Sequence, residues 1–190
     1  MSYKRFDKED IVISAESITA PAWRNNTTTL TSFTTSSSQI AGSSGDFYFN
    51  VFDTADTTDV QFTVAYGNRV GSGSIPFNST ITSNTPSRAV YGQYRTLING
   101  DENTDFSINS TTPDSVFFIS LERSKYKEKI LPGSLTLKVG DSSTAVLTDN
   151  SKNTITDTFS DAGRVYSIYS GSQGVVDNTT IEYGKIDREI

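Results

Sequence analysis

Apolar and polar residues alternate over several short stretches of the chain, with the period of two that is typical of β-strands. The clearest pair of stretches is DFYFNVFD, residues 46–53, and DVQFTVAYG, residues 59–67, with the polar run TADTT between them. The apolar residues on one side of these strands are Phe47, Phe49 and Val51 in the first and Val60, Phe62 and Val64 in the second. Because alternate residues share a face, the pattern predicts a β-hairpin that buries one face.

Further short strands are predicted along the rest of the chain. They lie at residues 11–13, around Leu30 and Phe33, and at 116–121, 134–140, 144–149, 164–171 and 179–186. Serine and threonine make up roughly a quarter of the residues, which also favours strands over helices. Short strands at regular spacing predict a mainly β fold, either a β-sandwich or a distorted barrel.

One segment, TPSRAVYGQYRTLING, has helical spacing instead. Its apolar residues recur three and four apart, at Val90, Tyr91, Tyr94, Leu97 and Ile98. Thr85 is a suitable N-cap, Pro86 suits the first turn, and Gly100 suits the end of a helix. We therefore predict one helix, Ser87 to Asn99, although Gly92 lies inside it.

Two segments are too rich in small polar residues to form core elements. They are the serine-rich run at residues 36–44 and the longer stretch NRVGSGSIPFNSTITSNTP, residues 68–86. Excursions of the second length inside a compact domain are usually functional or bound to a partner. We expect residues 68–86 to form such a loop.

Composition excludes several kinds of site. The 190 residues contain no cysteine and no histidine, so thiolate chemistry, disulfides and the commonest general base and metal ligand are absent. The net charge of -6 argues against a surface that binds nucleic acid throughout. No apolar run approaches a signal peptide or the roughly 20 residues of a membrane span. We predict no cofactor, no metal site and no catalytic residue.

The acidic residues offer only weak candidates for chemistry. Asp53, Asp56 and Asp59 lie three apart, but the glycine and closing glutamate of a calcium loop are missing, so a hairpin turn is the better interpretation. The carboxylates available for hydrolase chemistry are Asp101, Glu102, Asp114 and Glu122. None of them belongs to a catalytic motif, so a two-carboxylate hydrolase stays a minor alternative.

Aromatic residues provide a different alternative, a platform on which sugar rings stack. The candidates are Tyr48, Phe52, Tyr66, Tyr91 and Tyr94. Packing in the core and on sheet faces accounts for aromatic residues in these positions equally well.

A basic stripe in the run ERSKYKEKILPG is the most distinctive charged feature. Its cations occupy alternate positions, Arg123, Lys125, Lys127 and Lys129, with Tyr126 among the residues of the other face. In a strand the cations would share one face, either as a solvated sheet edge, as a docking site for an acidic partner, or, least favoured, as a nucleic-acid contact. A short helix would scatter the same cations around its circumference.

Several runs carry a family resemblance: MSYKRFDKEDIVIS, FYFNVFD with VQFTVAYGNRVGSGS, YGQYRTLI, FFISLERSKYKEKILPGSLTL and TDNSKNTITDTFSDAGRVYSIYSGSQG. They resemble virion structural proteins of contractile-tailed bacteriophages, of the kind found in marine cyanobacterial phages, which are associated with the tail and baseplate. The resemblance covers Met1 to about Gly174, and it consists of packing and turn patterns without a catalytic signature. Similar proteins continue well beyond the position of Ile190.

The resemblance implies a non-enzymatic structural subunit of a virion, assembled in the host cytoplasm. A wedge-type component of the tail or baseplate is the first expectation, and a neck or head-surface position is the second. The implied partners are other virion proteins or copies of this chain, through Arg123, Lys125, Tyr126, Lys127 and Lys129, with no nucleic acid and no membrane. Residues 1–190 would form one mainly β domain with a weak division near 110–115, or the N-terminal portion of a longer chain. A carbohydrate- or receptor-binding β-sandwich module, of the tail-fibre or adhesin type, is the alternative from another class.

Overall fold

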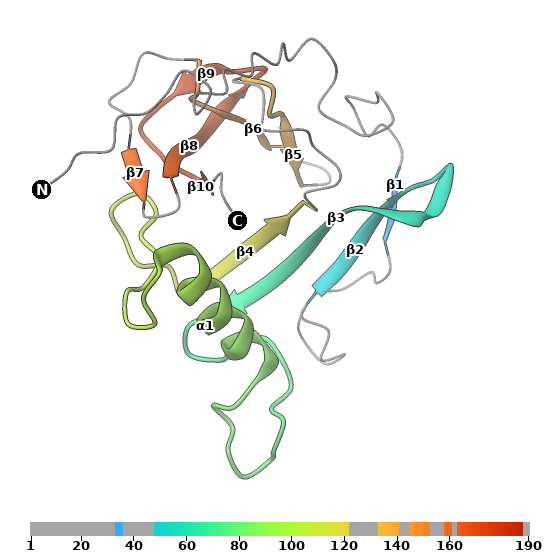
Figure 1. Cartoon of the computed structure of the whole chain (residues 1–190), viewed down its shortest axis with the longest axis vertical. Helices are drawn as coiled ribbons and strands as arrows, with labels where there is room; N and C mark the ends of the chain where they lie inside the picture. The colour runs from blue at the N-terminus through green and yellow to red at the C-terminus, as the bar shows by residue number, and fades with distance from the viewer. Residues whose placement is uncertain are drawn as a thin grey trace, which may run out of the picture.

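The computed structural model of the chain describes residues 33–35, 48–121, 133–140, 145–152, 158–160 and 163–187. In these ranges strands dominate, and the single helix is α1 (Pro86–Asn99). The strands form antiparallel sheets that include a curled half-barrel (Figure 1). The predicted mainly β fold with one short helix is confirmed, and the half-barrel is closer to the distorted barrel than to the sandwich.

The first sheet contains the predicted hairpin and one strand from each side of it along the chain. Its order is β1-β2-β3-β4, and each neighbouring pair is antiparallel. The strands are β1 (Phe33–Thr35), β2 (Tyr48–Asp53), β3 (Asp56–Asn68) and β4 (Ser115–Ser120). Residues 11–13, 36–44 and Phe47, for which the sequence also made predictions, lie outside the described residues.

The second sheet is built around one long strand, β8. Its order is β10-β8-β6-β5, and β7 and β9 also pair with β8. The strands are β5 (Leu137–Val139), β6 (Ala145–Asp149), β7 (Thr158–Ser160), β8 (Gly163–Ser172), β9 (Val175–Asn178) and β10 (Gly184–Asp187). The sequence pattern predicted β5, β6, β8 and β10 but not the short β7 and β9.

The register confirms the hairpin of β2 and β3. Phe49 lies opposite Val64, and Val51 lies opposite Phe62, so these four side chains share one face. The turn between the strands is closed by Asp53, whose carboxylate accepts a hydrogen bond of 2.9 Å from the backbone N–H of Ala55. On the predicted face Val51 is buried, at 3% exposure, whereas the helix packs on the opposite face of this sheet, where the sequence pattern did not place apolar packing.

Helix α1 begins one residue before the predicted start and ends at the predicted residue. Thr85 is the N-cap, with its side-chain oxygen accepting from the N–H of Arg88 at 3.3 Å, and Pro86 occupies the first turn. Gly100 closes the helix in the left-handed conformation, with a φ of 69°, and donates to the carbonyl of Thr96. Nothing in the structure explains Gly92, because a Cβ built there meets no atom within 4 Å.

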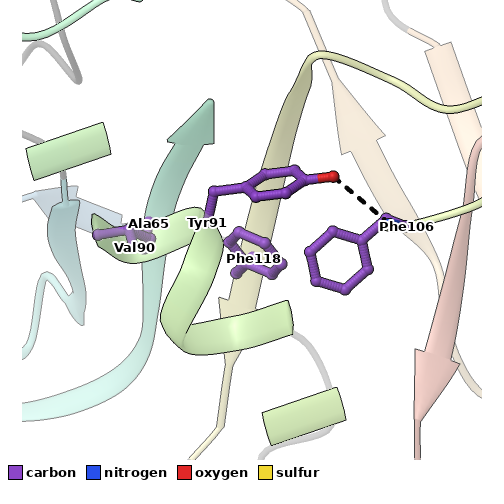
Figure 2. Packing of buried hydrophobic residues seen from close by; sticks show 5 residues of the cluster. All are labelled: Ala65, Val90, Tyr91, Phe106 and Phe118. Carbon is purple, nitrogen blue, oxygen red and sulfur yellow. Dashed lines mark hydrogen bonds between the residues drawn. The ribbon is translucent and has the colours of Figure 1, made fainter. Parts of the chain in front are cut away.

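The apolar core lies between α1 and the first sheet, as Figure 2 shows. Its buried members are Ala65, Val90, Tyr91, Phe106 and Phe118. The ring of Tyr91 meets Phe106 edge-on at 5.2 Å, and Phe118 stacks on Tyr94 at 4.1 Å between centroids. Gly67 allows this close approach, because a Cβ there would lie 2.8 Å from the Phe118 ring.

The second sheet buries polar side chains. Thr148 and Asp149 are almost completely inaccessible, and the carboxylate of Asp149 accepts hydrogen bonds from the backbone N–H groups of Gly133 (3.0 Å) and Leu135 (3.2 Å). It also accepts from Ser151, through both the backbone N–H and the hydroxyl. These bonds tie the segment that enters β5 to the end of β6.

The two sheets meet at a tight turn in the connection between α1 and β4. Asn109 and Ser110 both have positive φ, 51° and 58°, and the N–H of Asn109 donates to the carboxylate of Glu182 at 2.7 Å. The other carboxylate oxygen of Glu182 accepts from the hydroxyl of Ser167 in β8. The turn at Asn109 and Ser110 thus contacts the segment that enters β10, and through Glu182 it is linked to β8.

Candidate functional site

The basic stripe lies outside the described residues. Its members are Arg123, Lys125, Tyr126, Lys127 and Lys129, and Glu122 lies in the same undescribed segment. The stripe therefore stays a prediction from the sequence. The other predicted candidates fall within the described ranges.

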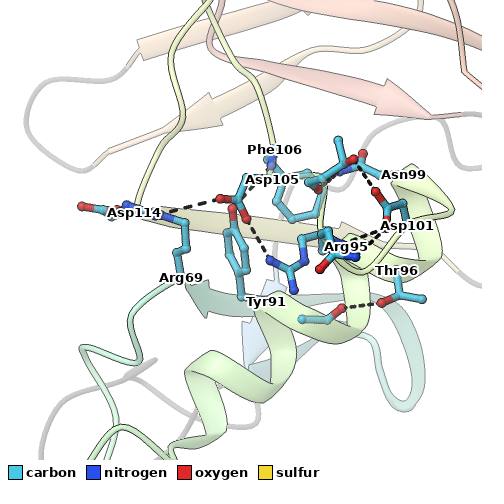
Figure 3. Close-up of polar contacts among 12 residues, drawn as sticks. Arg69, Tyr91, Arg95, Thr96, Asn99, Asp101, Asp105, Phe106 and Asp114 are labelled. Carbon is cyan, nitrogen blue, oxygen red and sulfur yellow. Dashed lines mark hydrogen bonds and ion pairs between the residues drawn. The ribbon is translucent and has the colours of Figure 1, made fainter.

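Asp101 stabilises the turn that follows α1. Its carboxylate, labelled in Figure 3, accepts hydrogen bonds from the hydroxyl of Thr104 (2.6 Å) and the backbone N–H of Asn103 (2.9 Å). The bond from Thr104, followed by the one from Asn103, lowers the pKa of Asp101. The residue is exposed and its oxygens are engaged by its own turn, which is a structural role.

Asp105 and Asp114 hold the long connection between α1 and β4 against the rest of the first sheet. Asp114 accepts from both Nε (3.0 Å) and Nη2 (2.6 Å) of Arg69, and this hydrogen bond raises the pKa of Arg69. Asp105 binds Arg95 at 2.9 Å and lies 3.9 Å from Arg69. The carboxylates are thus paired with arginines rather than with each other (Figure 3).

Tyr91 of α1 also belongs to this cluster. Its hydroxyl accepts the backbone N–H of Phe106 at 3.4 Å, and burial raises its pKa. The guanidinium of Arg95 lies 5.9 Å from the centre of the Tyr91 ring. Among the described residues, Arg95 Nε is the one buried side-chain nitrogen or oxygen atom without a hydrogen-bond partner. The cluster as a whole fastens a loop onto a helix.

The aromatic residues predicted as a sugar platform are not brought together. Tyr91 is buried and Tyr94 is stacked on Phe118, both on the α1 side of the sheet. Tyr66 points to the opposite face, where its ring packs at 5.4 Å from Phe117 and its hydroxyl bonds Ser115. Tyr48 lies opposite Ala65 and so belongs to the α1 side. Packing therefore accounts for Tyr66, Tyr91 and Tyr94, whereas Tyr48 is exposed and Phe52 lies opposite Val60 in the β2–β3 pair.

The acidic run in the β2–β3 hairpin acts as a turn. Asp53 closes the turn, and Asp56 accepts from the N–H and the hydroxyl of Thr58, at 3.0 and 2.7 Å. Within the described ranges no group of three acidic, histidine or cysteine side chains is placed to hold a metal ion. The interpretation of this run as a hairpin turn is confirmed.

The loop between β3 and α1 is the most exposed apolar feature of the described chain. We call residues 70–84 the projecting loop, because it extends away from both sheets beyond the start of α1 (Figure 1). Ile75, Phe77 and Ile81 are exposed, and the side chain of Phe77 is 65% accessible. None of the residues from 70 to 84 is charged. Large apolar side chains gathered on a protrusion indicate a binding surface.

The base of the projecting loop is firmly tied to the fold. The buried side chain of Asn68 accepts from the N–H groups of Val70 (3.1 Å) and Ser72 (2.8 Å). The buried hydroxyls of Thr85 and Ser87 donate to the carbonyls of Gly71 and Ser72, each at 2.9 Å. The loop therefore leaves the fold in a defined direction, which lowers the entropy lost when its tip binds.

One further hydrogen bond and one close approach order the tip and the neck of the projecting loop. The N–H of Phe77 donates to the carbonyl of Asn84 at 2.9 Å, which pairs the two arms. Gly73 has a φ of 82°, and a Cβ there would lie 2.8 Å from the ring of Tyr66. The sequence marked residues 68–86 as a functional loop from composition, and Ile75, Phe77 and Ile81 within that polar run were the signal of its exposed surface.

Comparisons with known proteins do not extend this picture. No family model matches the chain, no curated protein is significantly similar to it in sequence, and no solved structure significantly resembles its fold. Within the described residues, no helix has the length and apolar character needed to cross a membrane.

Proposed function

We propose that this chain is a non-enzymatic structural subunit of a bacteriophage virion, a wedge-type component of the tail or baseplate, and that it acts through protein–protein contacts. The observation that carries the proposal is the projecting loop, which exposes Ile75, Phe77 and Ile81 without a charged neighbour from residue 70 to 84. The sequence resemblance to tail- and baseplate-associated virion proteins supports the same role. Partners would be other virion proteins or copies of the chain, in the virion.

The chemistry of the polar residues is consistent with this role. Asp101 and Asp105 are engaged by a turn and by Arg95, and Asp114 is held by Arg69. In each case the carboxylate accepts from a donor of a neighbouring segment or of its own turn, and these charge-assisted bonds stabilise the loops. The basic stripe, Arg123 to Lys129, is proposed as a second contact, which docks on an acidic neighbour.

The proposal is tested in particles of a phage that encodes this sequence. Mass spectrometry of purified virions should find the chain in a fixed ratio to the other tail proteins. Phe77→Asp should leave the isolated chain folded, because Phe77 is exposed, and should lower incorporation of the chain into particles. The double change Lys125→Glu with Lys127→Glu exchanges charges that the sequence predicts to be solvated, and it should have the same two results. Val175→Asp, at an equally exposed apolar residue of the second sheet, is the control.

Absence of the chain from purified particles would overturn the virion role. Normal incorporation of the stripe variant would remove the stripe from the contacts and leave the projecting loop. Reproducible micromolar binding on a glycan array, lost with Tyr→Ala changes, would instead establish the carbohydrate-binding alternative.

A further inference from the structure

The end of helix α1 contains the one asparagine–glycine pair of the sequence, Asn99 and Gly100. In such a pair the backbone nitrogen of the glycine can attack the side-chain amide carbon of the asparagine, because glycine has no Cβ to hinder the approach. Gly100 has the left-handed conformation of a helix cap, with a φ of 69°. Asn99 is half-buried and Gly100 is exposed, so water reaches the pair.

The reaction open to this pair is deamidation. The N–H of Gly100 loses its proton, its nitrogen forms a bond to Cγ of Asn99, and the bond from Cγ to the amide nitrogen breaks, so that ammonia leaves with a proton. A cyclic imide remains, and water opens it at either of its carbonyl carbons. The product is an aspartate, or an isoaspartate in which the backbone runs through the former side chain. Water is the co-reactant, and neither oxidation nor reduction takes place.

Two hydrogen bonds and the helical backbone hold the pair out of the reactive arrangement. The N–H of Gly100 donates to the carbonyl of Thr96 at 3.1 Å, so the attacking nitrogen keeps its proton. The side-chain amide nitrogen of Asn99 donates to the carbonyl of Thr104 at 2.6 Å, which fixes the amide against the following turn. Asn99 is also a helical residue, and ring closure requires its ψ to leave the helical value of about −42°. The reaction therefore proceeds when the last turn of α1 opens.

The turn that follows α1 controls how often this opening occurs. The carboxylate of Asp101 accepts from the hydroxyl of Thr104 at 2.6 Å and from the N–H of Asn103 at 2.9 Å. These bonds keep the carbonyl of Thr104 in place as the acceptor for Asn99. Helix ends open locally at a small fraction of the free energy of global unfolding, so the loss of one such bond changes the open population several-fold.

We propose that Asn99 is a site of spontaneous deamidation, that it reacts through opening of the last turn of α1, and that the turn closed by Asp101 slows the reaction. The aspartate product has a carboxylate oxygen in place of the amide nitrogen that lies 2.6 Å from the carbonyl oxygen of Thr104. Two acceptors repel at that distance, and the new charge lies at the negative end of the helix dipole. Deamidation thus favours the open turn, and it does so independently of the proposed virion role.

The test follows conversion of Asn99 by peptide mass spectrometry in the full chain, folded or in guanidinium chloride. The folded chain should react about ten- to a hundredfold more slowly than the unfolded chain, and faster as the pH rises above neutral, because Gly100 must lose its N–H proton. Thr104→Val, which removes the hydroxyl bonded to Asp101, should raise the folded rate about fivefold. Thr111→Val, which removes a hydroxyl bonded to the carbonyl of Ile108 in another turn of the same connection, should leave the rate unchanged.

Hydrogen exchange at the N–H of Gly100 measures the same opening by another route. Exchange and deamidation should rise by the same factor in Thr104→Val. If that variant does not fold, guanidinium chloride at concentrations below global unfolding replaces it, and the two rates should again rise together. Asn99→Asp, which reproduces one product, should speed exchange at Gly100 more than Asn99→Ala, which loses the same hydrogen bond without adding a charge.

A folded chain that reacts about a thousandfold or more slowly than the unfolded chain would overturn the proposal, because the reaction would then wait for global unfolding. Equal rates in Thr104→Val and Thr111→Val would overturn the control by the turn at Asp101. Equal exchange in Asn99→Asp and Asn99→Ala would overturn the effect of the new charge. Each of these results leaves the virion role intact, because that role is measured by the presence of the chain in particles.

Discussion

The two sheets of this protein are stabilised in different ways. In the first sheet the most buried side chains are aromatic and aliphatic, and Tyr91, at 2% exposure, packs with Phe106 and against the strands (Figure 2). In the second sheet, Asp149 is 1% exposed and Thr148 is fully buried, while Leu147 is the one large apolar side chain that is buried in the described part of this sheet. The first sheet thus depends on area removed from water, and the second on buried acceptors and donors that are satisfied.

This difference has consequences for tolerance to substitution. An apolar core that loses atoms keeps its remaining contacts, and the loss grows with the cavity left behind. Removing a buried carboxylate leaves several backbone N–H groups without acceptors at once. The loss of stability then comes from these buried, unsatisfied groups. The second sheet should therefore be sensitive at a few polar positions and tolerant elsewhere.

The largest expected effect comes from removing an apolar side chain from the core of the first sheet. Phe118→Ala should lower the free energy of unfolding by about 3–5 kcal/mol, because it removes a ring that packs on Tyr94 and Phe106. Urea denaturation followed by circular dichroism measures the loss. Phe117→Ala is the matched control and should cost about 0.5 kcal/mol at a concentration where the chain is monomeric, since Phe117 is mostly exposed. Equal losses at the two positions would contradict the assignment of the core to the α1 side.

The next largest effect comes from removing the buried carboxylate of the second sheet. Asp149→Ala should cost about 2–4 kcal/mol, because the N–H groups of Gly133 and Leu135 lose their acceptor. Asp149→Asn keeps an acceptor oxygen and should cost less. Hydrogen exchange resolved by segment should show lost protection in β6 and β8 with β3 and β4 unchanged. Lost protection spread evenly over both sheets would show that they unfold as one unit.

The smallest expected effect concerns Asp101, whose carboxylate is exposed, in contrast to the buried carboxylate of Asp149. The pKa of Asp101 is lowered in the folded chain by the bond from Thr104, so its stabilising contribution is complete above the unfolded value near 3.8. The contribution is lost as the pH falls through the lower folded value. The difference in Tm between the unmodified chain and Asp101→Asn should therefore be constant from pH 5 to 7 and shrink below pH 4. A difference that grows on acidification would contradict this sign.

Much of the first sheet could be predicted from the sequence because its signals are local. The hairpin follows from alternation and a turn, and α1 follows from spacing and from Thr85, Pro86 and Gly100 at its ends. The face that α1 covers could not be predicted, since it depends on the close approach of Gly67 in β3 to the ring of Phe118 in the neighbouring strand β4. The pairing of Asp114 with Arg69 joins residues far apart in the chain and has no signature in the sequence.

The candidate site was predictable in position but not in form. Composition alone predicted a loop at residues 68–86, because small polar residues interrupt the strand pattern there, and the structure has no helix or strand between Asn68 and Pro86. That the loop projects as an ordered element depends on Asn68, Thr85 and Ser87, whose side chains bind the backbone of its base. Tyr66, against which Gly73 of the loop lies, comes to lie beside Phe117 only when β3 pairs with β4.

By itself the sequence determined the elements with short-range causes: the strands other than the short β7 and β9, the hairpin turn and the capped helix. Its composition also excluded cysteine and histidine chemistry. Only the tertiary structure decided which face of the first sheet α1 covers, that Asp149 is buried with several donors bonded to it, and that Asn68, Thr85 and Ser87 tie the base of the projecting loop to the fold. The physical reason is the distance along the chain over which each effect acts. Backbone preferences and periodicity act over a few residues, whereas burial and hydrogen-bond satisfaction depend on partners that the fold brings together from distant parts of the chain.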